Sequence, residues 1–134
     1  MRRIKPRILV ADDHPAILQQ VSELLAAQFD VVGVARDGVE LLRAAQYLKP
    51  DLVVTDFQMP RINGIHASRE LLNKRICKAV VLLTMYEEPH LIDAALKAGI
   101  RGFVLKSSAA EELIPAVREA LCGRVYLSAM ARFR

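Results

Sequence analysis

Five polar residues stand directly after short apolar segments of the sequence. Asp12 and Asp13 follow the first such segment, and Asp56, Thr84 and Lys106 follow three others. If these segments are parallel strands, their carboxyl ends meet at one edge of a sheet, which is where such sheets bind ligands. The spacing therefore predicts one site that contains three carboxylates, a hydroxyl and an ammonium group.

The repulsion among three carboxylates decides what such a site can do. At about 4 Å and an effective dielectric constant near 20, each close pair costs on the order of 4 kcal/mol. Protonation or a bound cation relieves this repulsion, and an oxygen-rich site with room for water suits Mg²⁺. The metal and Lys106 would neutralise a phosphoryl group, and Asp56, which is ionised without a base, could attack it to form an acyl phosphate.

Each of these residues has an ordinary structural interpretation when it is considered singly. Acidic residues at strand ends are most often turn or capping residues, so the prediction depends on their joint placement. His14 precedes Pro15, which favours a place at or beside the N-cap of a helix over a catalytic role. Cys77 and Cys122 have no partners at metal-ligand spacing, and we expect free thiols.

Short β-branched runs alternate along the chain with longer amphipathic runs. The apolar runs predict strands over residues 8–11, 31–35, 52–55, 79–83 and 102–105. Helices are predicted to begin near residues 15, 37, 64, 89 and 108. Asp37 and Ser108 each stand three residues before a glutamate, which is typical of a capping box at a helix start.

Apolar strands that alternate with helices indicate a parallel sheet covered on both faces. Right-handed crossovers then favour a doubly wound α/β fold, with five strands in the order 2-1-3-4-5 and five helices. The pattern continues without a linker as far as Gly123. We therefore predict one domain over residues 1–123 and a tail over residues 124–134 that is too short to fold alone.

The composition excludes several other classes of protein. The chain has 134 residues, of which 53% are hydrophobic, so it can bury a core and is not disordered. The net charge of +4 is mild and no basic stripe with a reading helix accompanies it, so direct DNA binding is not expected. The apolar runs are too short for a membrane span, and two cysteines are too few for a disulfide framework. A cytoplasmic protein without a membrane partner is expected.

Residues 7–122 resemble the receiver domain of two-component response regulators, in particular its NarL/FixJ (LuxR-type) branch. The motifs that carry the resemblance are Asp12-Asp13-His14-Pro15, Asp56-Phe57-Gln58-Met59-Pro60, Asn63-Gly64, Thr84 and Gly102-Phe103-Val104-Leu105-Lys106-Ser107. The resemblance implies a CheY-like, flavodoxin-like fold, in agreement with the order of strands and helices.

The resemblance also implies roles at the predicted site. Asp56 matches the phosphoacceptor, which takes a phosphoryl group from a sensor histidine kinase or a phosphotransfer domain. Asp13, Asp56 and the main-chain carbonyl of Gln58 match the ligands of Mg²⁺, with Mn²⁺ as a possible substitute, and Asp12 matches the acid that holds a metal-bound water. Lys106 matches the lysine that contacts the phosphoryl oxygens. On this interpretation the chain is not an enzyme in the usual sense and catalyses only its own phosphotransfer and dephosphorylation.

A conformational switch is implied by two further residues. Thr84 matches the hydroxyl that responds to phosphorylation, and Phe103 matches the aromatic residue whose rotamer follows it. The added charge and acceptor oxygens of a phosphoryl group would draw the Thr84 hydroxyl inward and open space for Phe103. Tyr86, two positions beyond Thr84, is expected to screen the acyl phosphate from water.

Regulators of the branch that the sequence resembles usually form homodimers when phosphorylated and carry a helix-turn-helix DNA-binding domain after the receiver. The first and fifth helices, or the fourth and fifth helices with their strands, are both plausible dimer surfaces. Residues 121–134 resemble only the start of a linker. The chain is thus either a receiver from a longer transcription regulator, which we favour, or a natural single-domain regulator, and it would contact DNA only through an output domain outside this sequence.

Three other functions are weighed against this one. A dehalogenase-type aspartyl-phosphate phosphohydrolase would need a second acid two residues beyond its nucleophile, where Gln58 stands. A flavodoxin-like cofactor binder would need a phosphate-binding loop after the first strand, where Asp12 and Asp13 would repel a phosphate. A degenerate receiver used only for protein contacts is disfavoured by the intact set of acids, hydroxyl and lysine.

Overall fold

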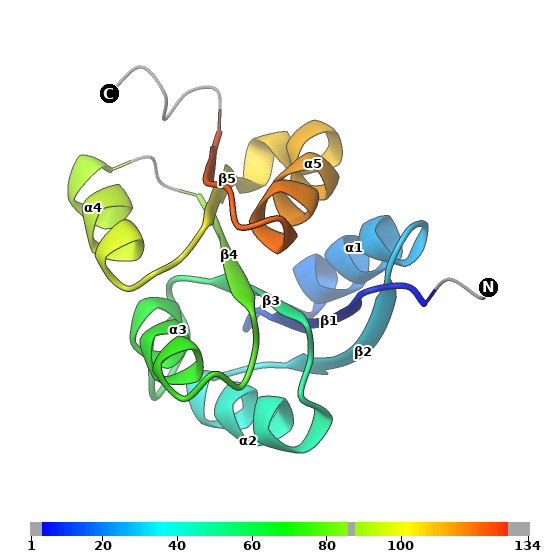
Figure 1. Ribbon diagram of the computed structural model, residues 1–134, viewed down its shortest axis with the longest axis horizontal. Coiled ribbons are helices and arrows are strands. Elements are labelled where there is room, and N and C mark those ends of the chain that lie inside the picture. Colours follow the sequence, from blue (N-terminus) through cyan, green and yellow to red (C-terminus); the bar gives the residue numbers. More distant parts are fainter. Residues whose placement is uncertain (1–3, 86–87, 129–134) are drawn as a thin grey trace.

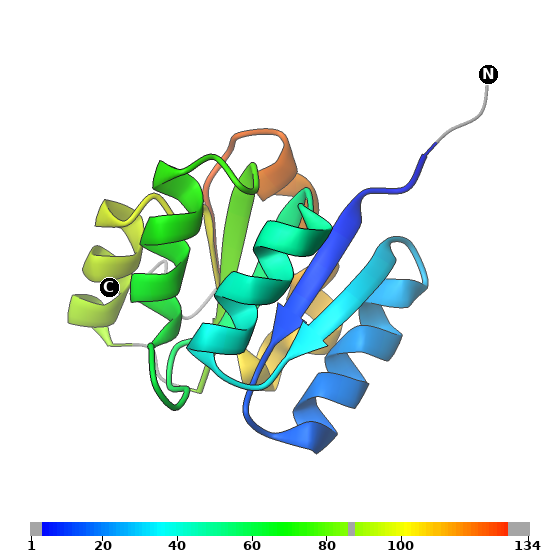
Figure 2. The same ribbon diagram turned by 90° about the horizontal axis from the view of Figure 1, so that it is seen from below.

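A six-stranded parallel sheet with helices on both faces forms the fold (Figures 1 and 2), in a computed structural model that describes residues 4–85 and 88–128. The strands are β1 (Arg7–Ala11), β2 (Asp30–Ala35), β3 (Leu52–Asp56), β4 (Ala79–Thr84), β5 (Gly102–Leu105) and β6 (Tyr126–Leu127). The helices are α1 (Pro15–Ala26), α2 (Gly38–Leu48), α3 (Gly64–Asn73), α4 (Pro89–Lys97) and α5 (Ala109–Leu121), and a short 3₁₀ turn η1 (Lys106–Ser108) precedes α5. The sheet order β2-β1-β3-β4-β5-β6 confirms the predicted doubly wound fold.

Two apolar cores lie on opposite faces of the sheet. Helices α1 and α5 cover one face, and α2, α3 and α4 cover the other. Neighbouring residues of a strand point to different faces, so in β1 Leu9 belongs to the core under α2 to α4 and Val10 to the core under α1 and α5. This double burial explains why the strands are continuously apolar. Within the described part of the chain, every helix is too short or too polar to cross a membrane.

Local sequence signals explain most helix starts. His14 is the N-cap of α1, with Pro15 at its first turn. Asp37 caps α2: its carboxylate accepts the Glu40 backbone N–H at 2.8 Å, and the Glu40 carboxylate accepts the Arg36 N–H at 3.0 Å. The cap predicted at Asp37 is therefore confirmed, although Glu40 accepts the N–H of Arg36 and not that of Asp37, as a capping box would have it.

The capping box predicted at Ser108 is wrong. Ser108 has φ −111° and ψ 7° at the end of η1, and its side chain makes no capping hydrogen bond to the described residues. The tight turn over Lys106–Ser108 replaces the extended backbone that a capping serine needs.

Both cysteines are free thiols, as predicted, and burial raises the pKa of Cys77 to about 11.

A sixth strand extends the five that the sequence predicts. Tyr126 and Leu127 of β6 pair in parallel with Gly102 and Phe103 of β5. A side-chain bond on α5 supports this pairing, because the Tyr126 hydroxyl donates to the Glu112 carboxylate at 2.7 Å. The first part of the predicted tail thus joins the edge of the sheet, whereas residues 129–134 lie outside the described residues.

The start of β1 also stabilises the end of α2. The Arg7 guanidinium donates to the backbone oxygens of Leu48 at 2.7 Å and Lys49 at 3.0 Å. These carbonyls end the helix and have no partner within it, and a cation there also interacts favourably with the helix dipole.

Removal of this arginine is predicted to weaken the fold. In an Arg7→Ala variant the two carbonyls lose their donor, and we expect the free energy of unfolding to fall by about 1–3 kcal/mol. Arg36→Ala, which removes an exposed arginine side chain, is the control and should change it by less than about 0.5 kcal/mol. Urea denaturation measures both, and equal losses in the two variants would contradict the capping role of Arg7.

Candidate functional site

The predicted site residues meet at the carboxyl edge of the sheet. Asp12 follows β1, Asp56 ends β3, Thr84 ends β4 and Lys106 follows β5. Because β3 lies between β1 and β4 in the sheet, Asp56 is central and the other residues flank it. Residues from almost the whole length of the chain are thereby brought to one site, as the strand-end argument requires.

Lys106 pairs with two buried carboxylates. Its Nζ atom lies 2.8 Å from Asp12 Oδ2 and 3.3 Å from Asp56 Oδ2. Asp12 and Asp56 are only 2% and 6% exposed, so water screens their charges poorly. One ammonium group thus compensates two carboxylates and leaves the site with an excess of negative charge.

Burial and charge oppose each other at these groups. Burial raises the pKa of Asp56, the neighbouring Asp12 charge raises it further, and Lys106 and the Phe57 N–H lower it only in part. That N–H donates to Asp56 Oδ1 at 2.8 Å and fixes the carboxylate. For Lys106, burial lowers the pKa, but the hydrogen bond to Asp12 and the two carboxylate charges outweigh burial and raise it. Lys106 is therefore a cation at neutral pH.

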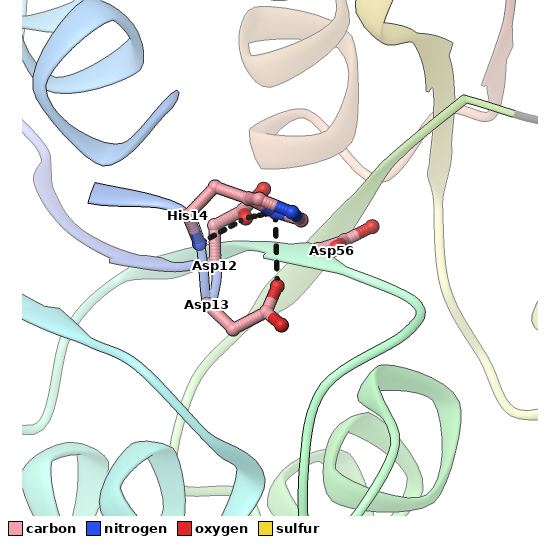
Figure 3. A group of neighbouring side chains, drawn as sticks. All are labelled: Asp12, Asp13, His14 and Asp56. Carbon is pink, nitrogen blue, oxygen red and sulfur yellow. Dashed lines mark hydrogen bonds and ion pairs between the residues drawn. The ribbon is translucent and has the colours of Figure 1, made fainter. Parts of the chain in front are cut away.

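His14 contacts the two acids that precede it (Figure 3). Its ring Nδ1 lies 3.1 Å from Asp12 Oδ1 and 3.0 Å from Asp13 Oδ1, and its backbone N–H donates to Asp12 Oδ1 at 2.9 Å. The sequence indicates the N-cap position of His14 but not the contacts of its ring. These contacts depend on how the chain turns between β1 and α1.

The donor groups fit a small divalent cation. Asp12, Asp13, His14 and Asp56 each offer one ligand atom, and these atoms all lie within 4.8 Å of one another. Three of the four residues are carboxylates, and hard oxygen donors with space for water are what Mg²⁺ prefers. The excess negative charge of the site favours a cation there.

A cavity of about 100 Å³ opens beside these acids. Its lining residues are Asp13, His14, Asp56, Gln58, Thr84, Met85 and Lys106. All predicted site residues except Asp12 and Phe103 therefore border one small polar cavity. Met85, an exposed apolar residue, also lines the cavity, and no pattern in the sequence points to it. Tyr86 lies outside the described residues.

Phe103 does not line the cavity and lies inside the core. It is 1% exposed and packs in the apolar cluster under α2 to α4, where it pairs with Leu82 across β4 and β5. Thr84, two residues beyond Leu82, is also buried and pairs with Leu105. The two predicted switch residues thus stand on adjacent strands with their backbones in fixed register.

The family of the chain follows from a match to a family model described as the response regulator receiver domain, which covers residues 8–118. The chain belongs to the response regulator receiver family. Receiver domains are phosphorylated on an aspartate as partners of histidine kinases or phosphotransfer proteins in two-component signalling, and they generally bind Mg²⁺ in an acidic pocket. The acid cluster described above has the composition of such a pocket.

Individual relatives agree with this assignment. Response regulator GacA of Pseudomonas aeruginosa is 36% identical over 124 residues, which are 91% of this chain and 58% of GacA. Transcriptional regulatory protein PdtaR of Mycobacterium tuberculosis is 37% identical over 116 residues, 86% of this chain and 56% of PdtaR. The chain thus spans less than two thirds of these curated relatives.

Solved receiver structures have the same fold. The signal receiver domain of the putative response regulator NarL from Mycobacterium tuberculosis matches with a TM-score of 0.85 and 31% identity, over 91% of this chain and 100% of that one. The isolated REC domain of RcsB from Salmonella enterica, solved with the phosphomimetic BeF₃⁻, matches with a TM-score of 0.86 and 25% identity, over 96% and 97% of the two chains.

Removal of the Asp56 charge is predicted to stabilise the metal-free receiver. An acid whose pKa is raised by folding destabilises the folded state when it is ionised. We therefore expect Asp56→Asn to raise the free energy of unfolding at pH 7 by about 0.5–2 kcal/mol in the presence of a chelator. Asp93→Asn, on the exposed side of α4, is the control and should change it by less than about 0.5 kcal/mol.

The pH dependence tests the cause of this gain. Between the ordinary pKa of an aspartate, about 4, and its raised value, the folded protein keeps a proton that the unfolded chain releases. The stability contributed by Asp56 is lost as the pH rises through this window. The difference between Asp56→Asn and the wild type should therefore be smallest in acid and grow toward neutral pH. A difference that stays constant with pH would contradict the electrostatic explanation.

Proposed function

We propose that this receiver accepts a phosphoryl group on Asp56 from a sensor histidine kinase or a phosphotransfer domain. The observation that carries the proposal is the central, fixed Asp56 carboxylate, which lies beside Lys106 at a cavity lined with groups that suit a divalent cation. Asp13, Asp56 and the Gln58 carbonyl would hold Mg²⁺ or Mn²⁺, and Asp12 would hold a water bound to it.

The residues of the chain account for the transfer as follows. An Asp56 carboxylate oxygen attacks the phosphorus of a phosphohistidine, an O–P bond forms, the P–N bond breaks, and the electron pair of that bond returns to the imidazole. No base is needed because the nucleophile is already ionised. Lys106 and Thr84 line the cavity, where the ammonium group would neutralise the phosphoryl oxygens and the hydroxyl would bind them. The metal, when bound, would offset the remaining negative charge.

We further propose that phosphorylation controls transcription. In this proposal the receiver belongs to the NarL/FixJ branch, lies in the cytoplasm, pairs with a second copy when phosphorylated, and acts on DNA through an output domain beyond residues 1–134. The relatives of the chain support this, since they include transcriptional regulatory proteins and a LuxR-family response regulator. The chain catalyses only its own phosphotransfer and dephosphorylation.

Phosphorylation with a small donor tests the proposal directly. Acetyl phosphate and Mg²⁺ should add one phosphoryl group per chain, and peptide mapping by mass spectrometry should place it on Asp56. The modification should be absent in Asp56→Asn and in the wild type with EDTA, and should persist in the control Asp93→Asn. Modification of another residue would overturn the assignment, and repeated turnover of phosphate esters would favour a phosphohydrolase.

The switch proposed for Thr84 and Phe103 has its own test. Phe103 is already buried here, so we propose that phosphorylation raises the population of this inward position. Couplings of this kind amount to about 1–3 kcal/mol. Thr84→Ala should still be phosphorylated but should lose most of the phosphorylation-dependent dimerisation measured by sedimentation velocity, whereas Thr84→Ser should retain it. Unchanged dimerisation in Thr84→Ala would contradict the coupling.

A further inference from the structure

The loop between β3 and α3 contains a strained turn close to the site. This loop carries Gln58, and three residues later Arg61 has a φ of 75°, which is unfavourable for a residue with a side chain. The Ile62 N–H donates to the Pro60 oxygen across Arg61 at 2.9 Å, which closes a three-residue turn. Strain of this kind persists only where the surrounding structure holds the backbone in place.

The first residues of α2 hold this turn from outside. The buried Gly38 donates its N–H to the same Pro60 oxygen at 3.3 Å. A Cβ atom on Gly38 would lie 2.1 Å from the Ile62 backbone oxygen, so any side chain there would push the two segments apart. The Asp37 carboxylate also faces the turn, 3.9 Å from Arg61 Nε.

The same segment is tied to the other half of the site. The backbone oxygen of Ala35, at the end of β2, accepts the N–H of Asp12 at 3.0 Å. Two hydrogen bonds fix the start of α2 after Ala35: the Asp37 carboxylate accepts the Glu40 N–H, and the Glu40 carboxylate accepts the Arg36 N–H. Residues 35–40 therefore connect the segment of Asp12 and Asp13 to the loop of Gln58.

Helix α3 fixes the opposite end of this loop. The Gly64 N–H donates to the Phe57 oxygen at 2.8 Å, and a Cβ atom on Gly64 would lie 2.0 Å from the Asp56 oxygen. The loop is thus held at one end beside Asp56 and in its middle by α2. Of these two supports, the one from α2 comes from a segment that also bonds Asp12.

We propose that Asp37 and Gly38, at the start of α2, are positioning residues for the phosphoacceptor site, which set its affinity for a divalent cation by fixing the Gln58 loop relative to Asp12 and Asp13. The inference rests on the proposed function, because it takes the acid cluster as the cation site. Neither residue borders the cavity. Loss of residues that orient metal ligands typically lowers metal affinity by 10–100-fold.

The test compares two glycine-to-alanine variants of the whole chain. Gly38→Ala should raise the dissociation constant for Mg²⁺, measured by calorimetric titration, about tenfold. Gly33→Ala in β2 is the matched control, because its Cβ atom would meet side-chain ends only, Leu48 Cδ1 and, at 3.4 Å, Leu9 Cδ1. The affinity of this variant should stay within about twofold of the wild type. In phosphorylation by acetyl phosphate, Gly38→Ala should raise the Mg²⁺ concentration needed for half-maximal rate, while the rate at saturating Mg²⁺ changes little.

A second pair of variants decides the matter if Gly38→Ala does not fold. Asp37→Ala removes the helix cap without adding atoms and should also weaken Mg²⁺ binding, whereas Asp37→Asn keeps a capping acceptor and should restore it. Wild-type affinity in the folded Gly38→Ala and Asp37→Ala variants would overturn the inference, as would an equal loss in Gly33→Ala. Absence of Mg²⁺ binding by the wild type would instead overturn the proposed function.

Discussion

The electrostatic balance among Asp12, Asp56 and Lys106 is the constraint on which the site depends. Two carboxylates buried side by side would destabilise the fold without a positive partner, and Lys106 lies within 2.8 Å and 3.3 Å of them. A single ammonium group leaves negative charge uncompensated, which is the condition under which a divalent cation and a phosphoryl group can enter together. The pKa of Asp56 is raised for the same reason, and its ionised carboxylate therefore destabilises the folded state.

The parallel sheet makes this balance possible, because every strand delivers its last residue to the same edge. Much of this arrangement could be predicted from sequence. Continuous apolar runs define the strands, and helix periodicity with the Asp37 cap locates the helices between them. These elements also predict the site, because the carboxyl ends of parallel strands lie at one edge of the sheet and bring the polar residues that follow them together. The structure moves Asp56 and Thr84 into the last positions of their strands, one residue later than the apolar pattern indicates.

Features that depend on contacts between distant segments were not predictable in this way. The strand β6 has only two residues, too few for a periodic pattern, and it relies on the bond from Tyr126 to Glu112. The false capping box at Ser108 has the right residues, but the preceding turn gives its backbone the wrong conformation. The support of the Gln58 loop by Gly38 could not be predicted either, because the sequence does not show which segment packs against a glycine at the start of a helix.

The position of β6 changes how the receiver would be joined to any domain that follows it. If the fold ended with its last helix, a linker to a following domain would begin at Gly123. The next five residues, through Ser128, are instead held against β5 and α5. They are not available to the linker, whose maximum length is therefore about 17 Å shorter at roughly 3.3 Å per extended residue. Its starting point also shifts to the strand that carries Phe103, so an attached module would begin its path beside the element proposed to respond to phosphorylation.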